Sequence, residues 1–186
     1  MNNSKGFSLL EVLITLLLTT VGVLGMVALQ TKGIQYTQDA GNRNAAVELA
    51  NDLVEIMRSH RDDLYINTPP TTYSYSELKN ATPVYETNGS LAMDISKCPA
   101  ASLPQTLEQA AGCWLKKVTE TLPGATTSAV KNKFRVCPSY KAGECAGTAY
   151  KGSSLEVVIA WGVNAGECMD GSENGSVCTY SARLEL

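Results

Sequence analysis

The sequence predicts an α+β fold in which one long N-terminal helix packs on a small antiparallel sheet, with a second helix and disulfide-closed loops. Three observations support this prediction. An apolar run near the start passes into an amphipathic helical pattern, alternating strand patterns occupy the last third, and all six cysteines lie in the second half. An even number of cysteines favours a disulfide framework in an oxidising compartment.

The first thirty residues join a short polar leader, ending at Lys5 and Gly6, to an apolar run from Phe7 to Leu29. A helix of about 23 residues spans roughly 34 Å, which is enough to cross a bilayer core. The run is longer than the apolar part of a cleaved signal peptide, which has about 7 to 15 residues. We therefore expect a retained membrane helix, and Lys5 predicts that the leader lies on the cytoplasmic side.

Glu11 is the one charged residue inside this apolar run. An acidic side chain in a membrane segment costs on the order of 2.5 to 3.5 kcal/mol at mid-depth, and is retained mainly where it has a partner. The α-amino group of a neighbouring chain, with a pKa of about 8, is such a partner. Glu11 is therefore interpreted as a pairing residue between packed helices, and an ordinary anchor with an incidental acid is the alternative.

The stretch Lys5-Gly6-Phe7-Ser8-Leu9-Leu10-Glu11-Val12 resembles the class III leader of type IV prepilins and type II secretion pseudopilins. The resemblance implies that a prepilin peptidase cleaves between Gly6 and Phe7 and that the new amino group of Phe7 is methylated. It also implies that Glu11 takes the family's pairing role during assembly. The proline that this family usually has in the middle of the helix is missing, and Ala28 stands near its place.

The chain is expected to have four parts: the cleaved leader 1–6, the transmembrane and assembly helix 7–29, its amphipathic continuation 30–62, and a periplasmic or extracellular head 63–186. The continuation is predicted because apolar residues recur at helical spacing on one face. His60 lies on this stripe, and no second histidine or cysteine at ligand spacing accompanies it. A packed or capping role is therefore favoured over a metal or catalytic one. The stripe consists of Ala46, Leu49, Ala50, Leu53, Met57 and His60.

A second helix is predicted to begin near Pro104 and to end before Pro123-Gly124. Ser102 and Gln105 have the spacing of a capping box, and Pro104 suits a first turn. Trp114 lies on the apolar face of this helix, so a core role is favoured over a binding role. The stretch before it, from Leu64 to Lys97, indicates an irregular connection with one short strand at 84–87. The predicted inner face is Leu107, Ala110, Ala111, Trp114, Val118 and Leu122.

Three strands are predicted at 132–137, 155–163 and 178–186, and the last two should form an antiparallel hairpin. In the first strand Phe134 alternates with Lys133 and Arg135, and Lys131 extends the basic face. A solvated strand face is favoured over contact with nucleic acid or a partner. The nearly balanced charges after His60 exclude a broad basic field.

Six cysteines allow fifteen connectivities. Sequential pairing is expected, because each such pair closes a short local loop. Closing a loop of about 15 residues stabilises a fold by roughly 3 kcal/mol. The expected pairs are Cys98 with Cys113, Cys137 with Cys145, and Cys168 with Cys178.

No catalytic motif is found: the chain has no G-x-S-x-G, P-loop, G-x-G-x-x-G or C-x-x-C pattern, so no enzyme, cofactor or metal is expected. The acidic loop 170–175 offers oxygen donors for calcium but lacks the EF-hand spacing, and a polar turn is favoured.

Three later segments resemble, more loosely, the PilV group of minor pilins of type IVa pili. They are the helix ending near Met57, the segment from Trp114 to Pro123-Gly124, and the strand reaching Trp161. The resemblance implies a type IV pilin-like fold and a minor pilin that primes filament assembly and is incorporated in small amounts. It also implies support of pilus biogenesis, twitching motility and adhesion. A type II secretion minor pseudopilin is the alternative, and a membrane-tethered periplasmic protein is the competing class.

The same resemblance implies the partners and the location. The partners are the prepilin peptidase and methylase, other minor pilins and the major pilin through the N-terminal helix, and a tip adhesin. Nucleic acid is not expected. The chain would cross the inner membrane once with its head in the periplasm, and later lie in the pilus on the cell surface.

Overall fold

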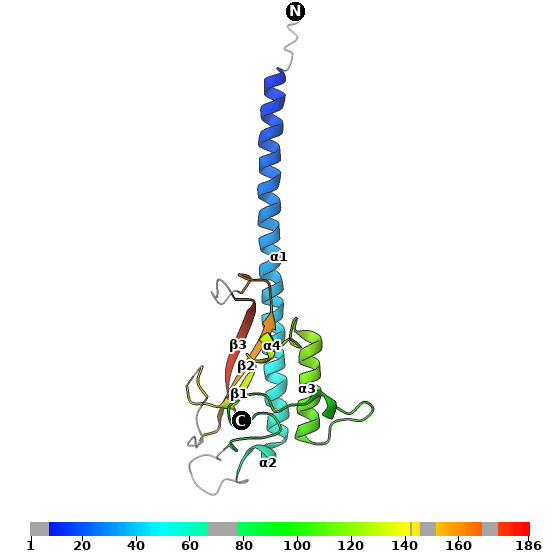
Figure 1. Ribbon diagram of the computed structural model, residues 1–186, viewed down its shortest axis with the longest axis vertical. Helices are drawn as coiled ribbons and strands as arrows, with labels where there is room; N and C mark the ends of the chain where they lie inside the picture. The colour runs from blue at the N-terminus through cyan, green and yellow to red at the C-terminus, as the bar shows by residue number, and fades with distance from the viewer. Residues whose placement is uncertain (1–7, 67–77, 142, 146–151, 169–174) are drawn as a thin grey trace, which may run out of the picture. The chain divides into compact units, whose positions relative to one another are not determined.

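The computed structural model describes residues 8–66, 78–141, 143–145, 152–168 and 175–186. The long helix, the second helix and the small antiparallel sheet confirm the predicted α+β fold (Figure 1). By their internal contacts the residues form two compact units, 1–38 and 39–186. The elements are α1 (Leu9–Ser59), α2 (Arg61–Leu64), the 3-10 helix η1 (Ile95–Lys97), α3 (Leu107–Thr121), α4 (Ser128–Lys131), β1 (Arg135–Pro138), β2 (Ser154–Gly162) and β3 (Val177–Glu185).

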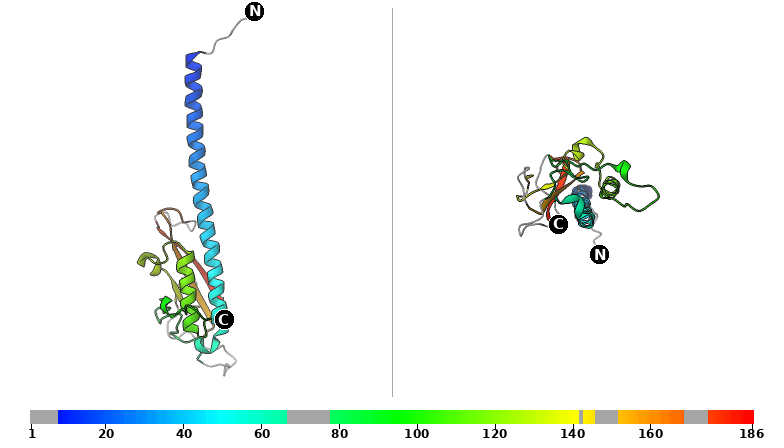
Figure 2. Two further views of the ribbon diagram at one scale, coloured as in Figure 1. Left: turned by 90° about the vertical axis from the view of Figure 1, so that its right-hand side faces the viewer. Right: turned by 90° about the horizontal axis from the view of Figure 1, so that it is seen from below.

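The C-terminal part of α1 belongs to the second unit and buries one face in it. Within this unit, α3 and the sheet both lie beside it (Figures 1 and 2). The Nε1 of Trp114 donates a hydrogen bond of 2.8 Å to the carbonyl of Leu49, which joins α3 to α1 in the core. The buried residues of α1 follow the spacing predicted from the sequence: Ala46, Leu49, Ala50, Leu53 and Met57.

The sheet has the order β1-β2-β3, and both pairs are antiparallel. The predicted hairpin of the last two strands is present, and its register places Trp161 opposite Cys178. Because β2 is the central strand, it is buried along nearly its whole length. One of its faces supplies core residues, namely Leu155, Val157, Ile159 and Trp161.

The prediction for β1 was wrong at its start, because a short helix occupies the residues before it. Asn132 ends α4 in an αR conformation, and its N–H bonds to the carbonyls of Ser128 and Val130. Since that N–H is used within a helical turn, the chain becomes extended only from Arg135. Phe134 is buried as predicted, although it precedes the strand.

The predicted start of α3 was also wrong, by about one turn. The helix is capped by Thr106, whose hydroxyl accepts a hydrogen bond from the N–H of Gln109. The Oε1 of Gln109 in turn accepts from the N–H of Gln105, the residue before the cap. Leu107, buried to 1% exposure, is the first apolar anchor, and the helix starts there rather than at Pro104. The predicted inner face of α3 is buried, including Trp114.

A small hairpin replaces the short strand predicted at 84–87. Tyr85 and Leu91 form an isolated bridge, and the N–H of Glu86 donates to the carbonyl of Ser90 at 2.9 Å. The carbonyl of Gly89, at the turn, accepts from the N–H of Val136 at 3.0 Å. The turn therefore covers part of the free edge of β1.

Three disulfides close local loops in the second unit, with the same pairing as expected from the sequence. They join Cys98 to Cys113, Cys137 to Cys145, and Cys168 to Cys178. The first ties the segment after η1 to α3.

The end of β3 is tied to the end of the first helix. The guanidinium of Arg58 donates to the carbonyl of Glu185 at 3.1 Å. Arg61 and the hydroxyl of Tyr65 both donate to the Leu186 oxygen at 3.1 Å. The two arginines thus donate to main-chain oxygens of Glu185, the last residue of β3, and of Leu186.

Candidate assembly site

The N-terminal turn of α1 is built on Ser8. Its carbonyl accepts from the N–H of Glu11 at 2.9 Å, and its hydroxyl lies 3.4 Å from the N–H of Leu10. Glu11 lies in this first turn, where the positive end of the helix dipole favours a negative charge. Ser8 and Glu11 have the S-x-x-E spacing of a capping box. Sequence reasoning missed this turn, although the spacing was its signal, and the turn differs from a full capping box because the N–H of Glu11 donates to the Ser8 carbonyl rather than to its hydroxyl.

The following part of α1 presents apolar side chains around its whole circumference. The helix contains a window with a mean hydropathy of 2.5, long and apolar enough to cross a membrane. Every residue from Leu9 to Ile34 is exposed within the chain. A helix that is apolar all round needs lipid or other apolar helices as neighbours.

Polar side chains in this segment bond to the helix itself. The hydroxyls of Thr15, Thr19 and Thr20 donate to carbonyls three residues earlier, at 2.8 to 3.0 Å. In lipid this satisfies hydroxyls that have no water partner. The positions Gly22 and Gly25 are open, with no atom within 4 Å of where a Cβ would lie. Small residues of this kind let a second helix approach closely.

Two family models match adjoining parts of the chain. The prokaryotic N-terminal methylation motif matches residues 1–27, and the Tt1218-like model, described as type IV pilin Tt1218, matches residues 28–104. The chain belongs to the type IV pilin family. The long N-terminal helix, the three-stranded antiparallel sheet and the three disulfides of this pilin fit that family. Comparisons with curated proteins and with solved structures found no match.

Family membership has consequences for the N-terminus of this pilin. It implies processing by a prepilin peptidase and assembly with other pilins, and the apolar helix behind a class III leader fits membrane anchoring. Gly6 and Phe7, the residues at the predicted cleavage point, lie outside the described residues. Cleavage there, methylation of Phe7 and pairing by Glu11 stay predictions.

The single histidine has a packing role. His60 is half-buried, and its Nδ1 lies 2.9 Å from both the carbonyl of Ile56 and the hydroxyl of Ser59. It also holds the N-cap position of α2. Among the described residues there is no group of three or more side chains suited to a metal ion. The acidic loop predicted as a polar turn lies, apart from Gly175, outside the described residues.

Proposed function

We propose that this pilin is a PilV-type minor subunit of a type IV pilus, which primes assembly of the filament and is incorporated in small amounts. In this role it supports pilus biogenesis, twitching motility and adhesion, and it has no catalytic activity. The leader 1–6 is removed, segment 7–29 anchors the chain in the inner membrane, and 30–62 continues the helix. The head 63–186 lies in the periplasm and later on the pilus.

The observation that carries this proposal is the unbroken backbone of α1. The helix extends over 51 residues from Leu9 to Ser59 and contains no proline. A proline inside a helix removes one main-chain hydrogen bond and weakens the turn around it. Without that weak point the helix resists local melting. A subunit that starts the filament does not need to be interchangeable with the subunits that extend it.

Glu11 gives this subunit a means of docking in register. In the assembly it would pair with the N-terminal α-amino group of a neighbouring pilin, and the two charges would compensate each other in lipid. The apolar surface that follows would pack on the helices of other minor pilins and of the major pilin. The head would contact those pilins or a tip adhesin, and the processing partner is the prepilin peptidase and methylase.

Two measurements test the proposal: quantitative proteomics of sheared filaments, and counts of surface filaments after deletion of the gene. We expect this chain to be far less abundant than another pilin, and we expect few filaments in its absence. Equal or greater abundance would make it a major subunit. Unchanged filament number with loss of protein secretion would instead identify a type II secretion pseudopilin. If the deletion changes neither filaments nor secretion, the proposed priming role is wrong.

A further inference from the structure

A polar pocket lies where the 86–90 turn meets the segment before β1. Gly89 has a φ of +82° in this turn, and a Cβ there would come within 3.1 Å of the Arg135 side chain and 3.2 Å of that of Cys137. The turn and the strand are therefore closely apposed, and glycine is required at their contact. The lining residues are Asn88, Gly89, Ser90, Asn132, Lys133, Phe134 and Arg135.

The lining of this pocket is rich in hydrogen-bond donors. Lys133 contributes an ammonium group and Arg135 a guanidinium group, and none of the described lining residues is a carboxylate. The Oδ1 of Asn88 already accepts from the N–H of Ser90 at 2.9 Å and from its hydroxyl at 2.7 Å. The Asn88 amide NH₂ therefore remains to serve a ligand, and the Asn132 side chain adds a second amide.

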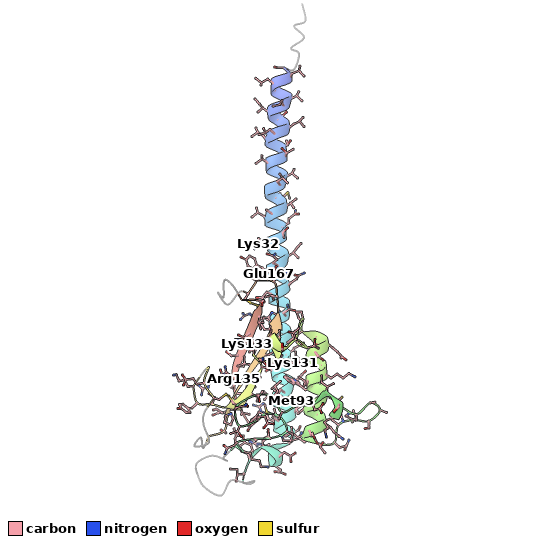
Figure 3. All side chains as sticks on the ribbon, viewed as in Figure 1. Lys32, Met93, Lys131, Lys133, Arg135 and Glu167 are labelled. Atoms are coloured by element: carbon pink, nitrogen blue, oxygen red, sulfur yellow. A yellow bond between two sulfur atoms is a disulfide. The ribbon has the colours of Figure 1, made fainter. Side chains whose placement is uncertain are left out.

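The two cations of the pocket have no ion-pair partner in the described part of the chain. The ion pairs there use Arg58, Lys97, Lys117 and Lys141. Glu156 lies on the adjoining strand, opposite Cys137, and its Oε1 accepts instead from the N–H of Gly143 at 2.7 Å. Figure 3 labels Lys133 and Arg135 together with Lys131, which is not a lining residue but adds a third cation nearby in the chain.

We propose that this pocket binds a phosphate group. Lys133 and Arg135 supply two positive charges, which match the charge of about −1.5 to −2 on a phosphate monoester at neutral pH. The planar fork of Arg135 suits two phosphate oxygens, and Lys133 acts as a point charge. A carboxylate carries half of that charge and would leave donors unused. A long polyanion is a poorer fit, because nucleic-acid binding typically neutralises about 6 to 10 phosphates.

The test is a titration of the mature full-length chain in neutral detergent micelles, followed by amide NMR signals at pH 7.5 and low ionic strength. Sodium phosphate is the probe, and sodium chloride and sodium acetate at matched ionic strength are the reference salts. We expect saturable shifts confined to residues 88–90 and 132–135, with a dissociation constant in the low millimolar range. Lys133→Gln with Arg135→Gln should weaken binding at least tenfold. Lys116→Gln with Arg183→Gln removes the same two charges at exposed positions outside the pocket, and should leave binding unchanged.

The single variant Lys133→Gln keeps the test valid if the double variant does not fold, because Lys133 is exposed and its replacement should not disturb the fold. It should weaken phosphate binding about threefold or more. A titration with glycerol 3-phosphate distinguishes free phosphate from a phosphate group carried by a larger molecule. If it binds as well as phosphate, the site accepts a phosphate carried by a larger molecule such as a lipid headgroup. If only phosphate binds, the site takes the free ion. The proposal is overturned if the shifts do not saturate, if acetate binds equally well, or if the pocket variants bind like wild type. Binding of single-stranded DNA without binding of phosphate would also overturn it.

Discussion

The indole Nε1 of Trp161 donates a hydrogen bond to Oδ1 of Asp39 at 3.1 Å, and both residues are buried, with exposures of 0% and 2%. The bond joins the central strand β2 to α1 inside the second unit. A buried carboxyl group needs such partners, because desolvation without hydrogen bonds is costly. Trp161 therefore contributes both apolar surface and a polar contact that fixes the position of the strand against the helix.

Replacing Trp161 with Phe should lower the free energy of unfolding by about 2 to 4 kcal/mol, because the core loses ring volume and Asp39 loses a donor. Urea denaturation of the mature chain in detergent, followed by circular dichroism, measures this loss. Trp114→Phe is the matched control, since Trp114 is also buried but donates to a main-chain carbonyl. Its cost should be smaller, and an equal or larger cost would contradict a special role for the Asp39 contact.

Alkaline pH should destabilise the head through Tyr85. Burial, with a smaller effect of Tyr65, raises the pKa of Tyr85 well above its usual value, and its hydroxyl donates to the Lys79 carbonyl at 2.8 Å. The unfolded chain ionises at this residue from about pH 10, whereas the folded chain keeps the proton. Stability is therefore complete below pH 10 and falls above it, by up to about 1.4 kcal/mol per pH unit.

Tyr85→Phe separates this effect from the other tyrosines. We expect it to cost about 1 kcal/mol near pH 7, from the lost hydrogen bond, and to flatten the fall in stability above pH 10. Tyr36→Phe, at a residue that is 57% exposed, is the control and should keep the fall. An unchanged alkaline slope in Tyr85→Phe would refute the assignment.

The cap of α3 gives a prediction with a built-in comparison. Thr106→Ala removes the hydroxyl that accepts from Gln109, and should cost about 1 kcal/mol of stability in denaturant titrations. Ser102→Ala should change stability by less than about 0.5 kcal/mol, because Ser102 is exposed and lies outside the helix. If Ser102→Ala costs more stability than Thr106→Ala, then Ser102 is the cap, as the sequence predicted.

Glu11 is predicted to act in assembly rather than in membrane insertion. Glu11→Ala should leave insertion intact while reducing recovery of the chain in sheared filaments at least tenfold, measured by quantitative proteomics. Glu11→Gln keeps a polar side chain in the first turn but removes the charge, and it should behave like Glu11→Ala. Assembly of the Gln variant at the wild-type level would show that the turn at Ser8, and not charge pairing, explains the residue.

Processing is predicted between Gly6 and Phe7. Mass spectrometry of the membrane-extracted protein should show a chain that begins at methylated Phe7. Gly6→Leu should block cleavage and leave the leader attached. Detection of Met1 in the wild-type protein, or of a cut after Leu29, would exclude this processing.

The sequence predicted elements with strong periodicity well and their ends poorly. The inner face of α3 and the hairpin of β2 and β3 followed directly from apolar spacing. The start of β1 could not be predicted in this way. Polar and apolar residues alternate around Lys133 and Phe134 as they do in a strand, although the chain is not extended there. The start of the strand is set by the N–H of Asn132, which donates to carbonyls of α4 and so keeps this residue in a helical turn.

Contacts between residues far apart in the chain could not be predicted from the sequence around either residue. Nothing near Asp39 in the sequence points to Trp161, 122 residues away, and nothing near Gly89 points to Val136, whose N–H donates to the Gly89 carbonyl. Both contacts arise from tertiary packing. The turn at Ser8 is the opposite case, since the S-x-x-E spacing from Ser8 to Glu11 is a local signal, although it also forms part of the leader motif.

The bonds from Arg58 and Arg61 to the last residues set an order for folding. They join positions 127 and 125 residues apart, whereas the disulfides span separations of only 15, 8 and 10. Short loops close at little entropic cost, but long ones form late. The oxidised loops can therefore exist before the head is complete. The end of the first helix can make these two bonds only after the final strand is in place, so a segment synthesised early is among the last to reach its finished contacts.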